Sequence, residues 1–152
     1  MLKVEKLRFG YNGRDVISSI DISVNRGSLM AILGPNGVGK TSLLKCINGI
    51  HKPKAGSVHV EDRNILNMSL NDIARHIGYV AQSIETVRLT VFDAVLMGRK
   101  PHLKWSVTKK DLIMVQSALE QLNLDHFSLK YIDQLSGGEL QKVAIARALV
   151  QE

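Results

Sequence analysis

Eight consecutive residues have the composition of a loop that binds a chain of phosphate groups. They match the pattern G-x-x-x-x-G-K-[ST] at every fixed position. A loop that aims successive backbone N–H groups at phosphates needs glycine wherever a Cβ would clash or φ is positive. Lys40 can supply a mobile positive charge for the outer phosphates, and the Thr41 hydroxyl can ligate Mg²⁺. The sequence therefore predicts a nucleoside-triphosphate site, and a plain glycine-rich turn is the alternative. The site comprises Gly34, Pro35, Asn36, Gly37, Val38, Gly39, Lys40, Thr41 and Ser42.

A second stretch also has the residue types of an anion-binding helix start. Ser136 can cap a helix, and Gly137 and Gly138 leave the first backbone amides exposed. The alternative is an ordinary capping box in which Ser136 pairs with Glu139. Because residues 34–41 already form a cradle for one nucleotide, the second site favours contact with a nucleotide held by a partner.

The elements that must position these residues change along the chain from strands to helices. Alternating or continuous apolar residues predict strands over residues 2–9, 16–24, 29–33, 57–60 and 77–81. Helices are predicted over residues 40–48, 69–76, 90–97, 108–122 and 136–152, with a loop over residues 98–106. We expect the first helix to bury Leu43, Leu44 and Ile47, and the fourth to bury Leu112, Val115, Leu119 and Leu122.

Length and composition narrow the class of protein further. The chain has 152 residues, 45% hydrophobic and 22% charged, which suits one globular domain. No apolar run approaches the ~18 residues of a membrane span, and the N-terminus lacks a signal-peptide core. Cys46 is the single cysteine, so no internal disulfide is expected. The net charge of +6 is dispersed, which favours a solvated surface over a nucleic-acid groove, and we expect no nucleic-acid partner.

The two motifs together resemble a known family. Leu135-Ser136-Gly137-Gly138-Glu139, followed by Ala144-Ile145-Ala146-Arg147-Ala148-Leu149, is similar to the signature motif and helix of ABC transporter ATPases. Gln82 and Tyr11 fall where that family has its Q-loop glutamine and its adenine-stacking aromatic residue. The resemblance implies an α/β fold: a P-loop NTPase (RecA-like) core with an antiparallel β subdomain and an inserted helical subdomain. The expected parts are residues 1–82, 83–135 and 136–152.

The resemblance also implies roles for single residues. In that family two domains form a head-to-tail dimer or pseudo-dimer, and each ATP lies between them. Lys40 and the loop amides would hold the phosphates, and Thr41 and Gln82 would hold Mg²⁺. Gln82 would also sense the γ-phosphate, so that Lys40 and Gln82 are the catalytic candidates. Tyr11 would stack on adenine, with simple packing as the alternative. Contacts to the partner's ATP are implied for Ser136, Gly137, Gly138, Glu139 and Gln141.

The segment over residues 90–101 is similar to the helical subdomain of importer ATPases for iron-siderophores, haem and cobalamin. A generic helix and loop is the alternative. The resemblance implies a peripheral subunit on the cytoplasmic face of the membrane, with permease subunits docking near residues 83–105. A soluble ABC-type ATPase of DNA repair or chromosome maintenance shares both motifs. Such proteins separate the motifs by coiled coils or zinc modules, which this sequence lacks. A non-catalytic nucleotide-binding module is a further alternative.

The family pattern continues past residue 152 with an apolar strand, a catalytic glutamate and a switch histidine. The helical pattern still runs at Glu152, so we expect a C-terminally incomplete domain with weak or absent hydrolysis. We also expect aggregation of the isolated chain through an unpaired sheet edge. The histidines match no catalytic position and are expected to be surface or packing residues: His51, His59, His76, His102 and His126.

Overall fold

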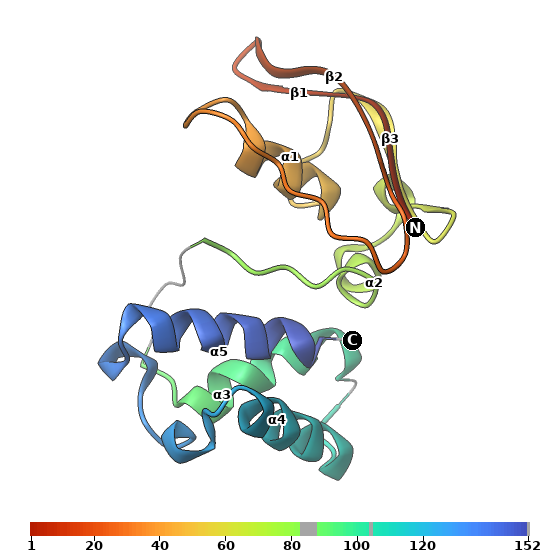
Figure 1. Cartoon of the computed structure of the whole chain (residues 1–152). Helices are drawn as coiled ribbons and strands as arrows, with labels where there is room; N and C mark the ends of the chain where they lie inside the picture. The colour runs from red at the N-terminus through yellow and green to blue at the C-terminus, as the bar shows by residue number, and fades with distance from the viewer. Residues whose placement is uncertain (83–87, 104, 152) are drawn as a thin grey trace. The chain divides into compact units, whose positions relative to one another are not determined.

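The computed structural model describes residues 1–82, 88–103 and 105–151, and the chain forms two compact units. The first unit is Met1–Ile73 and holds the strands, and the second is Ala74–Glu152 and is helical (Figure 1). This change from strands to helices is the one that the sequence predicts. The part boundaries expected after residues 82 and 135 stay predictions.

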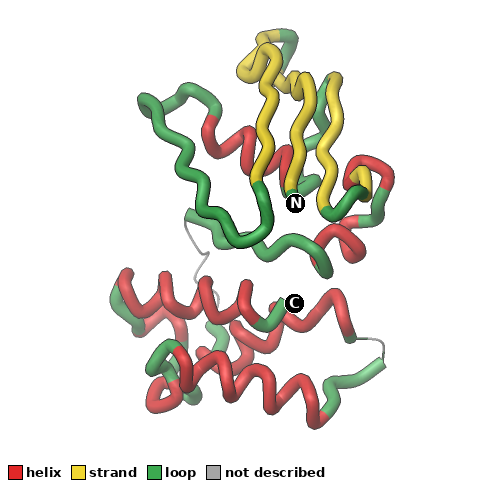
Figure 2. Tube along the Cα trace, turned by 45° about the vertical axis from the view of Figure 1, so that its right-hand side comes forward, coloured by secondary structure: helices red, strands yellow, loops and turns green. Residues whose placement is uncertain are grey.

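The first unit is built on a four-stranded antiparallel sheet. Its strands are β1 (Leu2–Tyr11), β2 (Arg14–Val24), β3 (Ala55–Val60) and β4 (Arg63–Asn64), in the order β2-β1-β3-β4 (Figure 2). The hairpin between β1 and β2 turns at Asn12 and Gly13, which both have positive φ, as a two-residue β-turn requires. The antiparallel β subdomain predicted from the sequence is therefore present.

Helix α1 (Lys40–Ile47) packs against β1 and completes the core of this unit. The buried side chains alternate along the strands and recur on one face of the helix, as expected for a half-buried sheet and an amphipathic helix. Gly49 has a φ of 68° just after the helix end, in agreement with the predicted stop. Leu44 is exposed, which corrects its expected place on the buried side. The core side chains are Val4, Leu7, Phe9, Ile17, Leu43, Cys46, Ile47, Val58, Ile65 and Ile73.

Two predicted strands are absent from the described part of the chain. Residues 29–33 and 77–81 have no strand assignment and pair with no described strand. Leu29 is 99% exposed and Leu33 is 89% exposed. A strand exists only through backbone hydrogen bonds to a neighbour, so an apolar run alone does not produce one. The expectation of buried strands at both positions is wrong for this structure.

The second unit packs three helices around one apolar cluster. They are α3 (Val91–Leu96), α4 (Lys109–Gln121) and α5 (Gly137–Leu149), and short 3₁₀ turns connect them. Thr108 and Asp111 form the predicted capping box at the start of α4. The cluster consists of Val91, Ala94, Val95, Val115, Ala118, Leu119, Leu124, Ile132, Val143, Ala146 and Val150.

Three details of the second unit differ from the sequence prediction. The expected loop over residues 98–106 begins as the 3₁₀ helix η2 (Met97–His102), which contains Pro101. Leu112 is exposed, so the buried face of α4 is narrower than predicted. Helix α5 ends at Leu149, where the prediction has it running to residue 152. The remaining short elements of the chain are α2 (Leu70–Ala74) and the 3₁₀ turns η1 (Ile65–Asn67), η3 (Asp125–Phe127) and η4 (Ile132–Gln134).

A buried ion pair ties η2 to the helices around it. Arg99 Nε donates to Asp111 Oδ1 at 2.9 Å, and both side chains are only 7% exposed. Arg99 Nη1 also donates to the carbonyl oxygen of Val150 at 2.8 Å. The guanidinium therefore joins the start of α4 to the end of α5. None of the helices in the described part of the chain combines the length and apolar character that a bilayer crossing requires.

Candidate phosphate-binding site

The loop over residues 34–41 has the backbone shape that its glycines allow. Gly37 has a φ of 81° and Gly39 a φ of 104°, values that L side chains rarely adopt. A Cβ on Gly39 would lie 2.8 Å from Val16 Cγ1, so this glycine is also required by contact with β2. Residues 34–38 are exposed, so the loop backbone is accessible to a ligand. This is the geometry that a phosphate cradle needs.

The loop leads directly into the N-terminus of α1. Its N-cap residue, Gly39, has no side chain that could cap the helix. Among the described residues, the first turn of α1 contains no acidic residue. The first-turn amides and the positive end of the helix dipole are therefore available to an anion. Lys45 lies in the last turn, at the negative end of the helix dipole, where its positive charge stabilises the helix.

The Lys40 side chain folds back over the loop that precedes it. Its Nζ atom donates to the carbonyl oxygens of Gly34, at 2.8 Å, and Pro35, at 2.7 Å. The ammonium group thus lies at the loop, where phosphate oxygens could replace the two carbonyls as acceptors. Thr41 is exposed in the first turn, so its hydroxyl is accessible. Mg²⁺ binds through nucleotide phosphates and a few protein oxygens, and the Thr41 hydroxyl fits that chemistry.

Tyr11 ends β1 and is anchored at its hydroxyl. The Oη atom lies 2.9 Å from His51 Nε2 and 3.3 Å from Ser42 Oγ. Phe9 meets the Tyr11 ring edge-on, with ring centroids 4.9 Å apart. Tyr11 is nonetheless 48% exposed. The residue therefore has packing contacts together with a solvent-accessible aromatic surface in the same unit as the loop.

His51 has more contacts than the sequence predicts. Its ring stacks on Phe9 at 5.0 Å with an interplanar angle of 6°, besides its hydrogen bond to Tyr11. The spacing of Phe9 and Tyr11 places both on one face of β1, which the sequence does show. The arrival of His51 at the same face depends on the path of the chain after α1. No local pattern in the sequence could have indicated it.

The second glycine motif begins α5, in the other unit. Ser136 N donates to Glu139 Oε2 at 2.7 Å, and Glu139 N donates to Ser136 Oγ at 3.4 Å, which completes a capping box. These hydrogen bonds from Ser136 lower the pKa of the Glu139 carboxyl from its ordinary value. Gly137 and Gly138 lie in the first turn, and a Cβ added to either would meet no atom of the described residues within 4 Å. Packing within the described part of the chain therefore does not explain either glycine.

The predicted site residues divide between the two units. The first unit brings together Tyr11, Ser42 and the loop over residues 34–41. The second contains Gln82 and Gln141, which are both exposed, and the motif at residues 136–139. The predicted permease-docking region over residues 83–105 is described only in part, because residues 83–87 and 104 lie outside the described residues.

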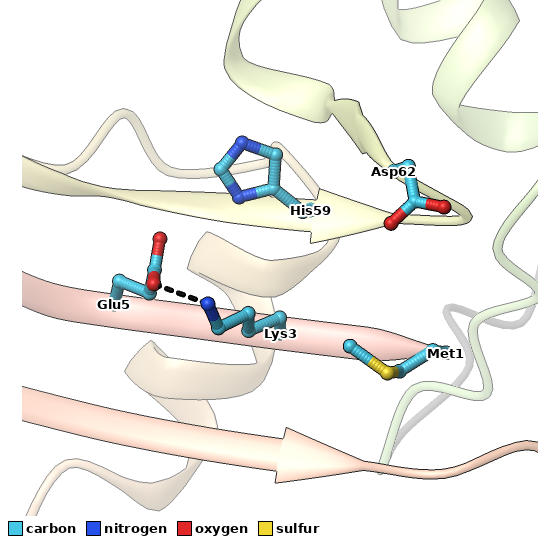
Figure 3. Close-up of a pocket in the computed structure, with 5 residues that line it drawn as sticks. All are labelled: Met1, Lys3, Glu5, His59 and Asp62. Carbon is cyan, nitrogen blue, oxygen red and sulfur yellow. Dashed lines mark ion pairs between the residues drawn. The ribbon is translucent and has the colours of Figure 1, made fainter.

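A separate hollow of about 270 Å³ lies on the sheet and has a different character (Figure 3). Its charged side chains include the ion pair between Lys3 Nζ and Glu5 Oε1 at 2.6 Å. That pair raises the pKa of Lys3 and lowers that of Glu5. Because the carboxylate already neutralises the lysine, this hollow does not have the net positive character of a phosphate site. It is lined by Met1, Lys3, Glu5, His59 and Asp62.

Comparison with known sequences places the chain among ATP-binding proteins of transporters. The chain is 49% identical over its full length to an uncharacterized ABC transporter ATP-binding protein of Methanocaldococcus jannaschii, of which it covers 60%. It is 38% identical over its full length to the spermidine/putrescine import ATP-binding protein PotA of Mycoplasma capricolum, covering 42% of it. It is 35% identical over 99% of its length to the iron(3+)-hydroxamate import ATP-binding protein FhuC of Bacillus subtilis, covering 57%. The chain thus spans about three-fifths or less of these relatives.

Solved structures show the same fold. A nucleotide-free ATP-binding cassette from an ABC transporter superposes with a TM-score of 0.87 at 28% identity, over 99% of this chain and 64% of that one. CbiO1 of Clostridium perfringens, part of the CbiONQ transporter complex, gives 0.82 at 31% identity, over 99% and 61%. These neighbours confirm the predicted fold class, a P-loop NTPase fold with an antiparallel sheet and helices. The sequence profile of the ABC transporter family matches residues 17–152. The chain belongs to the ABC transporter family of ATP-binding proteins.

Proposed function

We propose that this chain forms the ATP-binding part of an importer ATPase and takes ATP together with Mg²⁺. The observation that carries the proposal is the glycine loop that leads into the uncapped N-terminus of α1, with the Lys40 ammonium at its carbonyls. Anion affinity, a mobile cation and an accessible hydroxyl at Thr41 meet in one short segment. This combination fits a triphosphate better than any other ligand class.

The residues of the loop divide the work of binding. The backbone amides of residues 34–41 and the first turn of α1 hold the phosphate oxygens, and Lys40 exchanges its carbonyl acceptors for the outer phosphates. Thr41 ligates Mg²⁺, which neutralises phosphate charge when it is bound. Tyr11 offers its exposed ring to adenine. Gln82, exposed in the second unit, completes the Mg²⁺ and γ-phosphate contacts in the assembled protein.

The glycines at the start of α5 support contact with a second copy. A Cβ at Gly137 or Gly138 would meet no described atom within 4 Å, and we propose that their small size serves a molecule that approaches from outside. In the proposal that molecule is ATP bound to the partner's loop, in a homodimer or pseudo-dimer. Ser136, the two glycines, Glu139 and Gln141 line this approach, and the helix dipole favours the phosphate charge.

Import of an iron chelate is the transport activity that we propose. The similarity of residues 90–101 to importers of this kind and the relation to FhuC support it. Polyamine import, suggested by the relation to PotA, is the second candidate. The CbiONQ assembly of one neighbour supports permease subunits as partners, with the ATPase peripheral on the cytoplasmic face. Residues 88–103 and 105 are the described part of the proposed docking region.

Binding of a fluorescent ATP analogue tests the nucleotide site. Lys40→Met keeps an unbranched side chain as far as the ε position and removes the ammonium group, and we expect affinity to fall at least tenfold, a loss of about 1.4 kcal/mol. Lys45→Met in the last turn of the same helix is the matched control and should change affinity by less than about twofold. If Lys40→Met binds the analogue as tightly as the unmodified chain, the proposed site is wrong.

Hydrolysis needs a separate measurement. We propose that the family's ATPase activity belongs to the assembled protein and that the 152-residue chain turns over ATP weakly. The described loop provides a phosphate cradle, a cation and a hydroxyl, none of which is a base that could activate water. Phosphate release from the chain is measured at a saturating ATP concentration. Turnover at the rate of a complete cassette would contradict this part of the proposal.

A further inference from the structure

Three aromatic side chains gather beside the phosphate loop, and we call Phe9, Tyr11 and His51 the aromatic cluster. Phe9 and Tyr11 come from the end of β1, and His51 follows α1. The His51 ring lies flat on Phe9, while Tyr11 meets both other rings at right angles, 4.9 Å from Phe9 and 5.7 Å from His51. The hydrogen bond between Tyr11 Oη and His51 Nε2, at 2.9 Å, closes the cluster.

Tyr11 needs such contacts to stay in one place. It lies beside the two-residue turn of a hairpin and is about half exposed, so packing alone restricts its ring weakly. The hydroxyl is the point farthest from the backbone, and a hydrogen bond there fixes the whole ring. His51 is a firm anchor because Phe9 covers its ring and because its backbone N–H donates to the carbonyl of Lys45 at 3.1 Å.

The same contacts relate the Tyr11 ring to the phosphate loop. Ser42 Oγ, one residue after Thr41, lies 3.3 Å from Tyr11 Oη, and Lys45 is in the last turn of the same helix. Tyr11 is thus tied to both ends of α1, whose N-terminus forms half of the phosphate cradle. A ligand that uses the ring and the loop at once gains affinity when their spacing is fixed before it binds.

We propose that His51 is a positioning residue for base recognition: it holds the Tyr11 ring at the spacing from the phosphate loop that a nucleoside triphosphate requires. The inference rests on the proposed function, in which Tyr11 contacts the base. It assigns His51 no contact with the nucleotide. Loss of His51 therefore weakens ligands that have a base and leaves unchanged those that consist of phosphate alone.

The test compares two ligands, ATP and inorganic tripolyphosphate, by calorimetry on the full chain. Tyr11→Ala should weaken ATP and not tripolyphosphate. His51→Leu should weaken ATP roughly threefold to tenfold, the effect of one lost hydrogen bond, with tripolyphosphate within about twofold. His51→Gln, whose amide can still reach the Tyr11 hydroxyl, should recover part of the loss. His126→Leu replaces an exposed histidine of the other unit and should change neither affinity.

A double-mutant cycle adds a second readout. Tyr11→Phe removes the hydroxyl and with it the contacts to both His51 and Ser42, so it should lose at least as much ATP affinity as His51→Leu. The double variant should then lose no more than Tyr11→Phe alone, because the bond between Tyr11 and His51 is already broken there. Independent, additive losses would overturn the positioning role.

The outcomes separate the two proposals. If His51→Leu binds ATP normally while Tyr11→Ala does not, the inference is overturned and the base platform stands. If Tyr11→Ala binds ATP normally, the base platform fails and the inference fails with it. If His51→Leu weakens ATP and tripolyphosphate equally, His51 supports the loop as a whole and the positioning role is overturned. The Lys40→Met result tests the phosphate site independently of all three.

Discussion

At the scale of single residues, glycines in this chain serve two different purposes. Gly39 and Gly49 are required by the chain itself, since each has a positive φ and a Cβ on either would lie within 3 Å of a neighbouring side chain. Gly137 and Gly138 are under no such constraint. The four glycines look alike in the sequence. Only their surroundings in the structure show which are needed for folding and which leave space for another molecule.

Gly138→Ala should therefore fold at least as well as the unmodified chain. Alanine in a helix is more favourable than glycine by roughly 0.5–1 kcal/mol, so the melting temperature should stay equal or rise. Self-association that depends on ATP should fall, because the new methyl group occupies the approach path. Thermal melts and light scattering with ATP measure the two effects. Gly49→Ala is the contrasting control and should lower the melting temperature, because Gly49 has a φ of 68°, at which alanine is strained. A lower melting temperature in Gly138→Ala would contradict the assignment.

At the scale of elements, one buried guanidinium connects three separate segments of the second unit. Arg99 joins η2 to Asp111 in the first turn of α4 and to the carbonyl after α5. Hydrogen bonds from Thr108, together with the Arg99 guanidinium, hold the pKa of Asp111 well below its usual range. Breaking such a pair leaves one charge buried without compensation, which is more costly than never having had the pair.

Arg99→Met should lower the melting temperature of the chain by on the order of 10 °C at neutral pH. Lys100→Met, the adjacent exposed residue, is the matched control and should shift it little. Circular dichroism at 222 nm follows the helices directly. An unchanged melting temperature in Arg99→Met would show that the guanidinium contributes nothing net.

Acid should weaken the same junction. Because the Asp111 pKa is depressed in the folded chain, the unfolded chain binds a proton first as pH falls below about 4. The stabilisation is therefore complete at neutral pH and is lost progressively as pH decreases toward the folded-state pKa. Asp111→Asn should be less stable at pH 7 and should lose less stability between pH 5 and pH 3. Parallel slopes for the two proteins, in melts across that range, would exclude the role of Asp111.

The sequence predicts elements well where the signal is local. Thr108 with Asp111, and Ser136 with Glu139, mark helix starts within one residue, since a cap is a short-range interaction. The strands predicted from the apolar runs at residues 29–33 and 77–81 are absent, because a strand depends on hydrogen-bond partners far along the chain. The phosphate-binding loop at residues 34–41 could be predicted from its glycines. The contacts of His51 and Arg99 could not be predicted from the sequence. Their roles arise from tertiary contacts, which periodicity does not encode.

At the scale of the whole molecule, exposed apolar side chains are the feature that most favours aggregation of the chain. Leu29 and Leu33 are nearly fully exposed on a segment whose backbone pairs with no described strand. Unpaired amides beside leucines offer a template for edge-to-edge pairing with another chain. The net charge of +6 opposes association only weakly at physiological ionic strength.

We therefore expect the isolated chain to associate as its concentration rises. Leu29→Lys should reduce this association by adding charge to the template. Leu129→Lys makes the same change at a leucine that is 83% exposed in the other unit, and should have a smaller effect. Light scattering over a concentration series compares them. A chain that stays monomeric at all concentrations would contradict the expectation.

The two hydrogen bonds of Lys40 to its own loop have a consequence for how tightly any nucleotide is held. In population terms, the ammonium can direct all three of its N–H groups at a γ-phosphate only in the fraction of molecules in which it has left the carbonyls. The apparent dissociation constant is the intrinsic one divided by that fraction. The carbonyl oxygens of Gly34 and Pro35 thus compete with the ligand for the Lys40 ammonium. The chain could gain affinity by weakening an internal bond, with no new contact to ATP.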